Sequence, residues 1–105
     1  MMARPLVSMA GVGLVVLSSA AHTHSPTIDC WKKKQTIFCE VGFSDGSKAR
    51  GKDVSVISYD EEILATKQAD KFSRVEFQVP EDGLEYYIYF DAKHEFPIEV
   101  DYGEL

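Results

Sequence analysis

The spacing of short β-type runs limits the fold of this chain more than any other feature of its sequence. Runs rich in β-branched and aromatic residues recur at intervals of about 8–12 residues, with turn-forming residues between them. No run shows the periodicity of an amphipathic helix. They cover residues 27–32, 36–43, 53–58, 63–67, 74–79, 84–91 and 98–102. The pattern predicts a single all-β domain, a sandwich of about seven strands.

Alternation of polar and apolar residues within these runs indicates which side chains face the core. It is strict in residues 74–79 and clean in residues 98–102. Residues 84–91 include the most apolar of the β-type runs, which predicts a central strand. The predicted core consists of Trp31, Phe38, Val54, Val56, Phe77, Val79, Tyr87, Tyr89 and Val100.

The amino-terminal segment has the organisation of a secretion signal. Arg4 is the only charged residue before Asp29, and the run Leu6–Leu17 is apolar or small throughout. Ser19 and Ala21 then occupy the −3 and −1 positions of a cleavage site. We therefore expect a cleaved signal helix over residues 1–21.

Two alternatives to this cleavage stay open. The peptidase could cut after Ala20, or the segment could remain as a membrane anchor, although its apolar run is shorter than the ~20 residues that a spanning helix needs. With cleavage after Ala21, residues 22–28 are predicted to be a flexible amino terminus and residues 29–105 the sandwich domain. Export places the protein in the periplasm or outside the cell.

The only cysteines are Cys30 and Cys39, and in an exported chain such a pair is read as a disulfide. If the first two runs form a hairpin whose facing residue numbers sum to 69, Cys30 faces Cys39 across a two-residue turn, Lys34-Gln35. The pair then takes a non-hydrogen-bonded position, where strands approach most closely and a bridge fits. Lys-Gln is a poor turn dipeptide, so a longer loop is the alternative.

The charge of the exported part argues against several classes of partner. Of the 11 basic side chains Arg4 lies in the signal, which leaves ten against 17 acidic ones, a net charge of −7. A chain this acidic does not favour nucleic acid or anionic lipid surfaces. No segment after the signal is long and apolar enough to span a membrane.

The new amino terminus is a candidate metal site. Cleavage after Ala21 exposes His22-Thr23-His24, which supplies a free amine, two backbone amides and an imidazole at the third residue. Four nitrogens in a square plane suit Cu(II) or Ni(II). His22 adds a second imidazole, and His94 is a further candidate ligand. A cut after Ala20 would move His24 to the fourth place and remove the site.

The stretch Phe43-Ser44-Asp45-Gly46-Ser47, followed by Gly51, resembles a turn of small exported domains in the carboxypeptidase regulatory-like, or transthyretin-like, group. The resemblance continues through Val54 and Val56, residues 63–67, residues 74–80 and the run Tyr87–Ala92. It implies an immunoglobulin-like sandwich. Asp45, Gly46 and Gly51 are expected to be structural turn residues, because Asp caps turns and Gly supplies positive φ.

Within that group the chain looks most like periplasmic accessory proteins of nickel and cobalt uptake transporters, which begin with a histidine after cleavage. That position is His22 here. Family members usually have a histidine in a Gly-rich segment after the Phe-Asp-Ala motif, whereas His94 stands two places early, so its role does not carry over directly. The resemblance implies Ni(II), Co(II) or Cu(II) as the bound metal and a metal-uptake membrane transporter as the partner.

The sequence therefore predicts an exported accessory protein that binds or presents a transition metal through His22 and His24. An enzyme is not expected, since no Ser-His-Asp pattern or glycine-rich phosphate loop is found and the cysteines are paired. The alternative function is a structural or protein-interaction β-sandwich module without a metal. A copper carrier of the small β-barrel kind is a third possibility.

Overall fold

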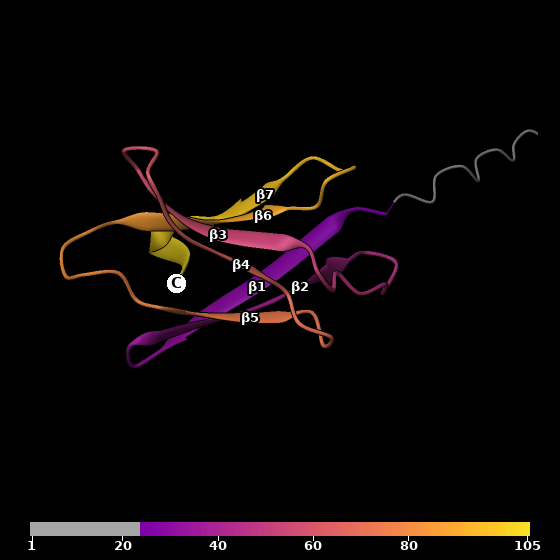
Figure 1. Ribbon diagram of the computed structural model, residues 1–105, viewed down its shortest axis with the longest axis horizontal. Helices are drawn as coiled ribbons and strands as arrows, with labels where there is room; N and C mark the ends of the chain where they lie inside the picture. The colour runs from indigo at the N-terminus through magenta and orange to yellow at the C-terminus, as the bar shows by residue number, and fades with distance from the viewer. Residues whose placement is uncertain (1–23) are drawn as a thin grey trace, which may run out of the picture.

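The computed structural model describes residues 24–105, so the expected signal over residues 1–21 and the candidate ligand His22 lie outside the described residues. Within the described residues, seven strands and one short 3-10 helix follow one another (Figure 1). They are β1 (Pro26–Lys33), β2 (Thr36–Phe43), β3 (Asp53–Ser58), β4 (Ile63–Gln68), β5 (Arg74–Gln78), β6 (Tyr86–Asp91), β7 (Ile98–Val100) and η3 (Tyr102–Glu104).

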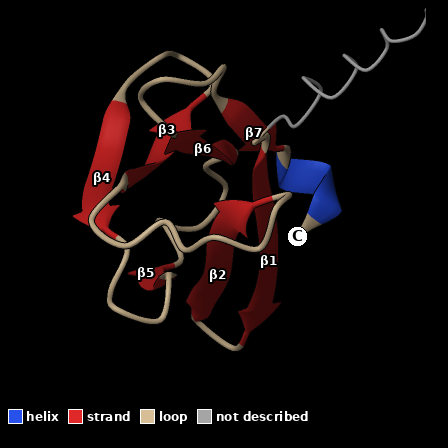
Figure 2. Cartoon of the chain, turned by 90° about the vertical axis from the view of Figure 1, so that its right-hand side faces the viewer, coloured by secondary structure: helices blue, strands red, loops and turns tan. Residues whose placement is uncertain are grey.

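The strands form two antiparallel sheets, which confirms the predicted all-β class and the predicted number of strands. One sheet has the order β1-β2-β5 and the other the order β4-β3-β6-β7. The sheets face each other (Figure 2), and buried side chains from both form one core cluster between them. This is the two-layer arrangement by which antiparallel sheets bury one face each.

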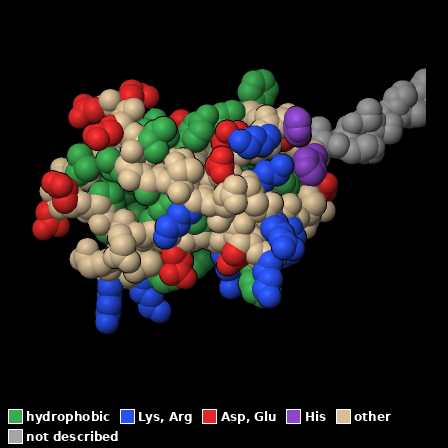
Figure 3. Space-filling model, viewed as in Figure 1, with side chains coloured by type: hydrophobic (Ala, Val, Ile, Leu, Met, Phe, Trp, Pro, Cys, Tyr) green, Lys and Arg blue, Asp and Glu red, His purple; other side chains and the backbone are tan. Residues whose placement is uncertain are grey.

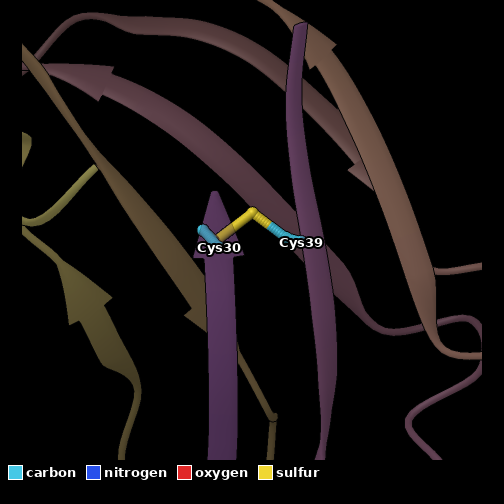
Figure 4. Close-up of a disulfide and its surroundings, with 2 residues drawn as sticks. All are labelled: Cys30 and Cys39. Atoms are coloured by element: carbon cyan, nitrogen blue, oxygen red, sulfur yellow. A yellow bond between two sulfur atoms is a disulfide. The ribbon is translucent and has the colours of Figure 1, made fainter. Parts of the chain in front are cut away.

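The β1–β2 hairpin has the predicted register and the predicted disulfide. Cys30 pairs with Cys39, and the pairs sum to 69 from Pro26 opposite Phe43 to Lys33 opposite Thr36. The cysteine Cα atoms are 4.1 Å apart and the sulfurs are bonded (Figure 4). Lys34, the first residue of the two-residue turn, has a φ of 58°. Primed hairpin turns require a positive φ at this position.

Strand β1 begins at Pro26, before the expected domain boundary at residue 29. Residues 26–28 therefore belong to the sheet rather than to the flexible amino terminus expected over residues 22–28. Ile28 explains the difference, since its side chain is partly buried against the core. The β-type run over residues 27–32 already included Thr27 and Ile28, so the boundary expected at residue 29 was placed too late.

The predicted core residues on β3, β5 and β7 are correct, but those on β1, β2 and β6 belong to the outer faces of the sheets. Val54, Val56, Phe77 and Val100 are buried as predicted. Tyr87 and Tyr89 are only partly buried, because Tyr86, Ile88 and Phe90 are the residues of β6 that face the core. Val79 is only half-buried, just beyond the end of β5. The inward residues that the prediction missed include Ile37, Val41, Phe43, Val75, Tyr86, Ile88 and Phe90.

Trp31 and Phe38 lie on the outer face of the three-stranded sheet rather than in the core. The Trp31 side chain is 44% exposed, and its ring stacks on Phe38 with centroids 6.0 Å apart. Successive strand residues point to opposite faces. Because the Cys30–Cys39 bridge belongs to the core side, both neighbouring aromatic residues must point away from it.

Candidate metal site at the amino-terminal end

Three parts of the chain meet at the end of the sandwich where β1 begins (right-hand side of Figure 1). They are the residues just before β1, the β2–β3 loop over residues 44–52, and the β6–β7 loop over residues 92–97. The first part carries His24 and the last carries His94. The β2–β3 loop carries Asp45, Gly46 and Gly51.

Asp45 organises the β2–β3 turn with its own side chain. Its Oδ1 accepts hydrogen bonds from the Ser47 backbone N–H at 3.0 Å and the Ser47 hydroxyl at 2.7 Å. Gly46 has a φ of 89°, and its N–H donates to the Phe43 carbonyl at 2.8 Å. Gly51 has a φ of 79° and donates to Ala69. These are turn roles that the residue types favour.

The second carboxylate oxygen of Asp45 holds His24. Asp45 Oδ2 lies 2.8 Å from His24 Nδ1, and the two side chains are 48% and 43% exposed. The His24 ring also stacks on Phe43, with centroids 4.1 Å apart and planes inclined by 13°. The imidazole is therefore fixed in position by one polar and one aromatic contact.

The contact between His24 and Asp45 extends the register of the hairpin beyond its strands. Ser25 precedes Pro26 and Ser44 follows Phe43, and the Ser44 N–H donates to the Ser25 carbonyl at 2.7 Å. The Ser25 N–H in turn donates to the Ser44 hydroxyl at 3.0 Å. The same sum of 69 that pairs the cysteines thus places His24 opposite Asp45.

Sequence reasoning gave Asp45 only a turn role and missed Phe43 as a support for His24. Only the contact of His24 with Asp45 was within reach of the sequence. Continuing the hairpin register past residue 27 would have paired His24 with Asp45, 21 residues away. The expectation of a flexible segment before residue 29 stopped the register too early.

The environment of Asp45 keeps its carboxylate ionised. The hydrogen bonds from the Ser47 hydroxyl and from His24 lower the pKa of Asp45 far below its usual range, and the Ser47 backbone N–H adds to the shift. A pKa that is lower in the folded than in the unfolded state stabilises the fold above the unfolded pKa, which is about 3.9. That contribution is lost only as the pH falls through the lower folded-state pKa.

His94 lies on the surface of the β6–β7 loop. Its backbone N–H donates to the Ala92 carbonyl at 2.8 Å, and the Lys93 N–H before it donates to the Asp91 carboxylate at 2.9 Å. The two described histidines, coloured purple in Figure 3, lie at the same end of the molecule. No contact joins the side chains of His24 and His94.

Within residues 24–105, no group of three or more His, Cys, Asp or Glu side chains is arranged to hold a metal ion. His24 alone of the two predicted terminal ligands falls in the described part. Its Nδ1 is the ring nitrogen nearest the backbone, so it can close a six-membered chelate ring with the amide nitrogen of its own residue. A metal at His24 would thus need its other nitrogens from residues 22 and 23.

Comparisons with known proteins add no neighbour. The chain matches no protein-family model, no curated protein and no solved structure. Among the described residues, no helix has the length and apolar character needed to cross a membrane.

Proposed function

We propose that this is an exported accessory protein that binds or presents Ni(II), Co(II) or Cu(II) through its mature amino terminus. The observation that carries the proposal is the position of His24 at the start of the folded domain, where its imidazole stacks on Phe43. Its Nδ1 contact with Asp45 would give way to the metal, whereas the stacking on Phe43 does not involve that nitrogen. His24 would be the third residue of the processed chain. Because its ring packs against the domain, a metal bound to it would lie on the surface of the folded domain and not on a free tail. The Cys30–Cys39 bridge supports this by holding β1 against β2.

Four nitrogens would form the site. They are the α-amine of His22, the amide nitrogens of Thr23 and His24, and the His24 Nδ1. The amine has a pKa of about 7.7–8.0, so a metal can displace its proton near neutral pH. Two ionised amides balance the charge of a divalent ion, and the square plane suits Ni(II) and Cu(II). His22 and His94 offer imidazoles outside the plane.

The finer features of the proposal rest on the family resemblance and on the residues before His24. We propose an immunoglobulin-like, transthyretin-like sandwich, a cleaved signal over residues 1–21 and a periplasmic or secreted location. The proposed partner is a metal-uptake membrane transporter. The resemblance to accessory proteins of nickel and cobalt transporters supports the choice of partner and adds Co(II) to the candidate metals.

The test of the metal site is a substitution that keeps both terminal histidines. Thr23→Pro removes a backbone N–H that must ionise to bind the metal, because proline has none. We expect Cu(II) and Ni(II) affinity to fall by more than about 100-fold, beyond the 10–100-fold cost of losing a supporting residue. Calorimetric titration of the processed protein, with its amino terminus verified by mass spectrometry, measures this loss.

Two control variants sharpen the test. A glycine inserted between Ala21 and His22 moves His24 to the fourth place and should reproduce the Thr23→Pro result with every native side chain present. His94→Ala removes an imidazole outside the square plane and should leave the affinity nearly unchanged. If the processed wild-type protein and the Thr23→Pro variant bind Cu(II) equally, the four-nitrogen site does not exist.

A further prediction concerns Asp45, which competes with the metal for His24 Nδ1. Removing the carboxylate by Asp45→Ala should tighten Cu(II) binding by up to about fivefold. The reason is that an exposed ion pair contributes at most about 1 kcal/mol and must break before Nδ1 can bind a metal. Parallel titrations of the two proteins at one pH check the effect. Weaker binding by Asp45→Ala would mean that the carboxylate assists the metal instead.

A further inference from the structure

The outer face of the four-stranded sheet is unusually apolar at β6. The inward residues Tyr86, Ile88 and Phe90 are fully buried, which leaves Tyr87 and Tyr89 on the opposite side of the same strand. An antiparallel strand with one face in solvent normally carries polar residues on that face. Aromatic side chains on both faces indicate that the outer face has a use besides contact with water.

Neighbouring strands extend this apolar surface. Ile57 of β3 pairs with Tyr87 and with Ile63 of β4. Tyr59 lies just beyond β3, and its ring is 5.3 Å from that of Tyr87. Ile63 is 64% exposed, whereas Ile57 is 9% exposed because its neighbours cover it. We call this surface the tyrosine face, defined by Ile57, Tyr59, Ile63, Tyr87 and Tyr89.

The outer face of the three-stranded sheet differs in charge pattern. There Asp29 pairs with Glu40, Glu40 pairs with Arg74, and the Arg74 guanidinium contacts the Glu40 carboxylate at 3.3 Å. Its one aromatic pair, Trp31 and Phe38, lies beside this charged row. Only the tyrosine face therefore joins several apolar side chains from three strands.

Carboxylates border the tyrosine face. Glu99 of β7 lies directly opposite Tyr89, and Glu61 belongs to the β3–β4 turn, where acidic side chains gather (red, upper left of Figure 3). Burial raises the pKa of Tyr87, and the negative charges of Glu61 and Glu99 raise it further. The tyrosine face thus carries a negative potential at both sides of Tyr87.

Basic side chains near this sheet are occupied elsewhere. Lys67, the only basic residue in its four strands, reaches across to β5 and donates to the Glu76 carbonyl at 2.7 Å. Lys93 in the next loop contacts Asp53 and Asp91 at 3.5 and 3.9 Å. Neither of them neutralises Glu61 or Glu99, so an incoming cation would meet uncompensated carboxylates.

We propose that the tyrosine face docks a segment of a partner protein that carries arginine or lysine side chains between apolar ones. Tyrosine rings attract cations over their faces, arginine most often. The carboxylates of Glu61 and Glu99 lie where those cations would arrive, and tyrosine is enriched among the residues that dominate binding energy in interfaces. Ile63, which is 64% exposed, receives the apolar side chains. The docking surface is independent of the proposed metal site.

The test uses a short synthetic peptide in which arginine and leucine alternate, titrated into the ¹⁵N-labelled processed protein. We expect amide shifts confined to β3, β4, β6 and β7 and the β3–β4 turn. Tyr87→Thr should weaken binding by about tenfold, since truncating a central interface aromatic has effects of that size. Glu99→Lys should weaken it as well, with less sensitivity to salt, because a charge attraction is removed.

Matched controls decide the outcome. Trp31→Thr removes an exposed aromatic ring from the other sheet and should leave binding unchanged, and Glu99→Lys tests the face without altering its packing. Failure of the arginine–leucine peptide to bind overturns the proposal. So does equal binding of a glutamate–leucine peptide, or a set of shifts centred on Trp31. Concentration-dependent self-association that Tyr87→Thr abolishes would assign the face to a second copy of this chain instead.

Discussion

Phe90→Ala is expected to lower the free energy of unfolding by about 3–5 kcal/mol, the usual cost of truncating a buried Phe. Phe90 is fully buried in β6, opposite Val54. A domain of this size has a total stability of only about 4–12 kcal/mol. The variant should therefore be close to unfolded at 37 °C, which denaturant titration followed by circular dichroism measures.

The matched control is the next residue back along the strand. Tyr89→Thr truncates a side chain of similar size on the outer face and places there a β-branched residue, which suits a strand. Its expected cost is about 1 kcal/mol, the centre of the distribution for single substitutions. Equal costs for the two variants would show that the faces of β6 are assigned wrongly.

Truncation of Phe90 should also change the position of His24 in the candidate metal site. The Phe43 ring lies 6.2 Å from that of Phe90 on its inner side and stacks on His24 on the other. Truncation of Phe90 to Ala leaves space in the core, into which the Phe43 ring can shift. The imidazole would then lose its aromatic support while its contact with Asp45 remains.

The faces of β6 show why the core could be predicted only in part from the sequence. Alternation identifies the inward face when one set of residues is polar, as it is around Val75 and Phe77 on β5. In the run Tyr86–Phe90 both sets are apolar, so periodicity does not choose between them. The choice depends on the pairing with β3, which sets Phe90 and Ile88 opposite Val54 and Val56.

The β1–β2 hairpin shows the opposite case, in which a few residues of the sequence determine the pairing of two whole strands. Two cysteines and a short turn were enough to predict the register of β1 against β2, and that register also positions His24 opposite Asp45. The core position of Trp31 was wrong although the same register excludes it, since Cys30 beside it faces inward. The stacking of His24 on Phe43 depends on ring orientations that the register does not specify.

Reduction of the Cys30–Cys39 bridge is expected to destabilise the domain by about 2.5 kcal/mol, because the loop it closes is short. The sequence separation of the two cysteines is 9. For a domain of this size that loss corresponds to a fall in melting temperature of about 10–20 °C. Differential scanning calorimetry with and without reductant measures the shift, with thiol counting to verify that Cys39, buried at 1% exposure, has been reduced.

The Cys30→Ala/Cys39→Ala double variant serves as the control, because reductant should not change its melting temperature. The consequence for function follows from the position of β1. This strand is at the edge of its sheet and pairs only with β2, so the bridge is its one covalent tie to the core. Without the tie, β1 should fray first and release His24 from Asp45. An unchanged melting temperature in fully reduced protein would mean that backbone pairing alone holds β1, and that the proposed terminal site does not depend on an oxidising compartment.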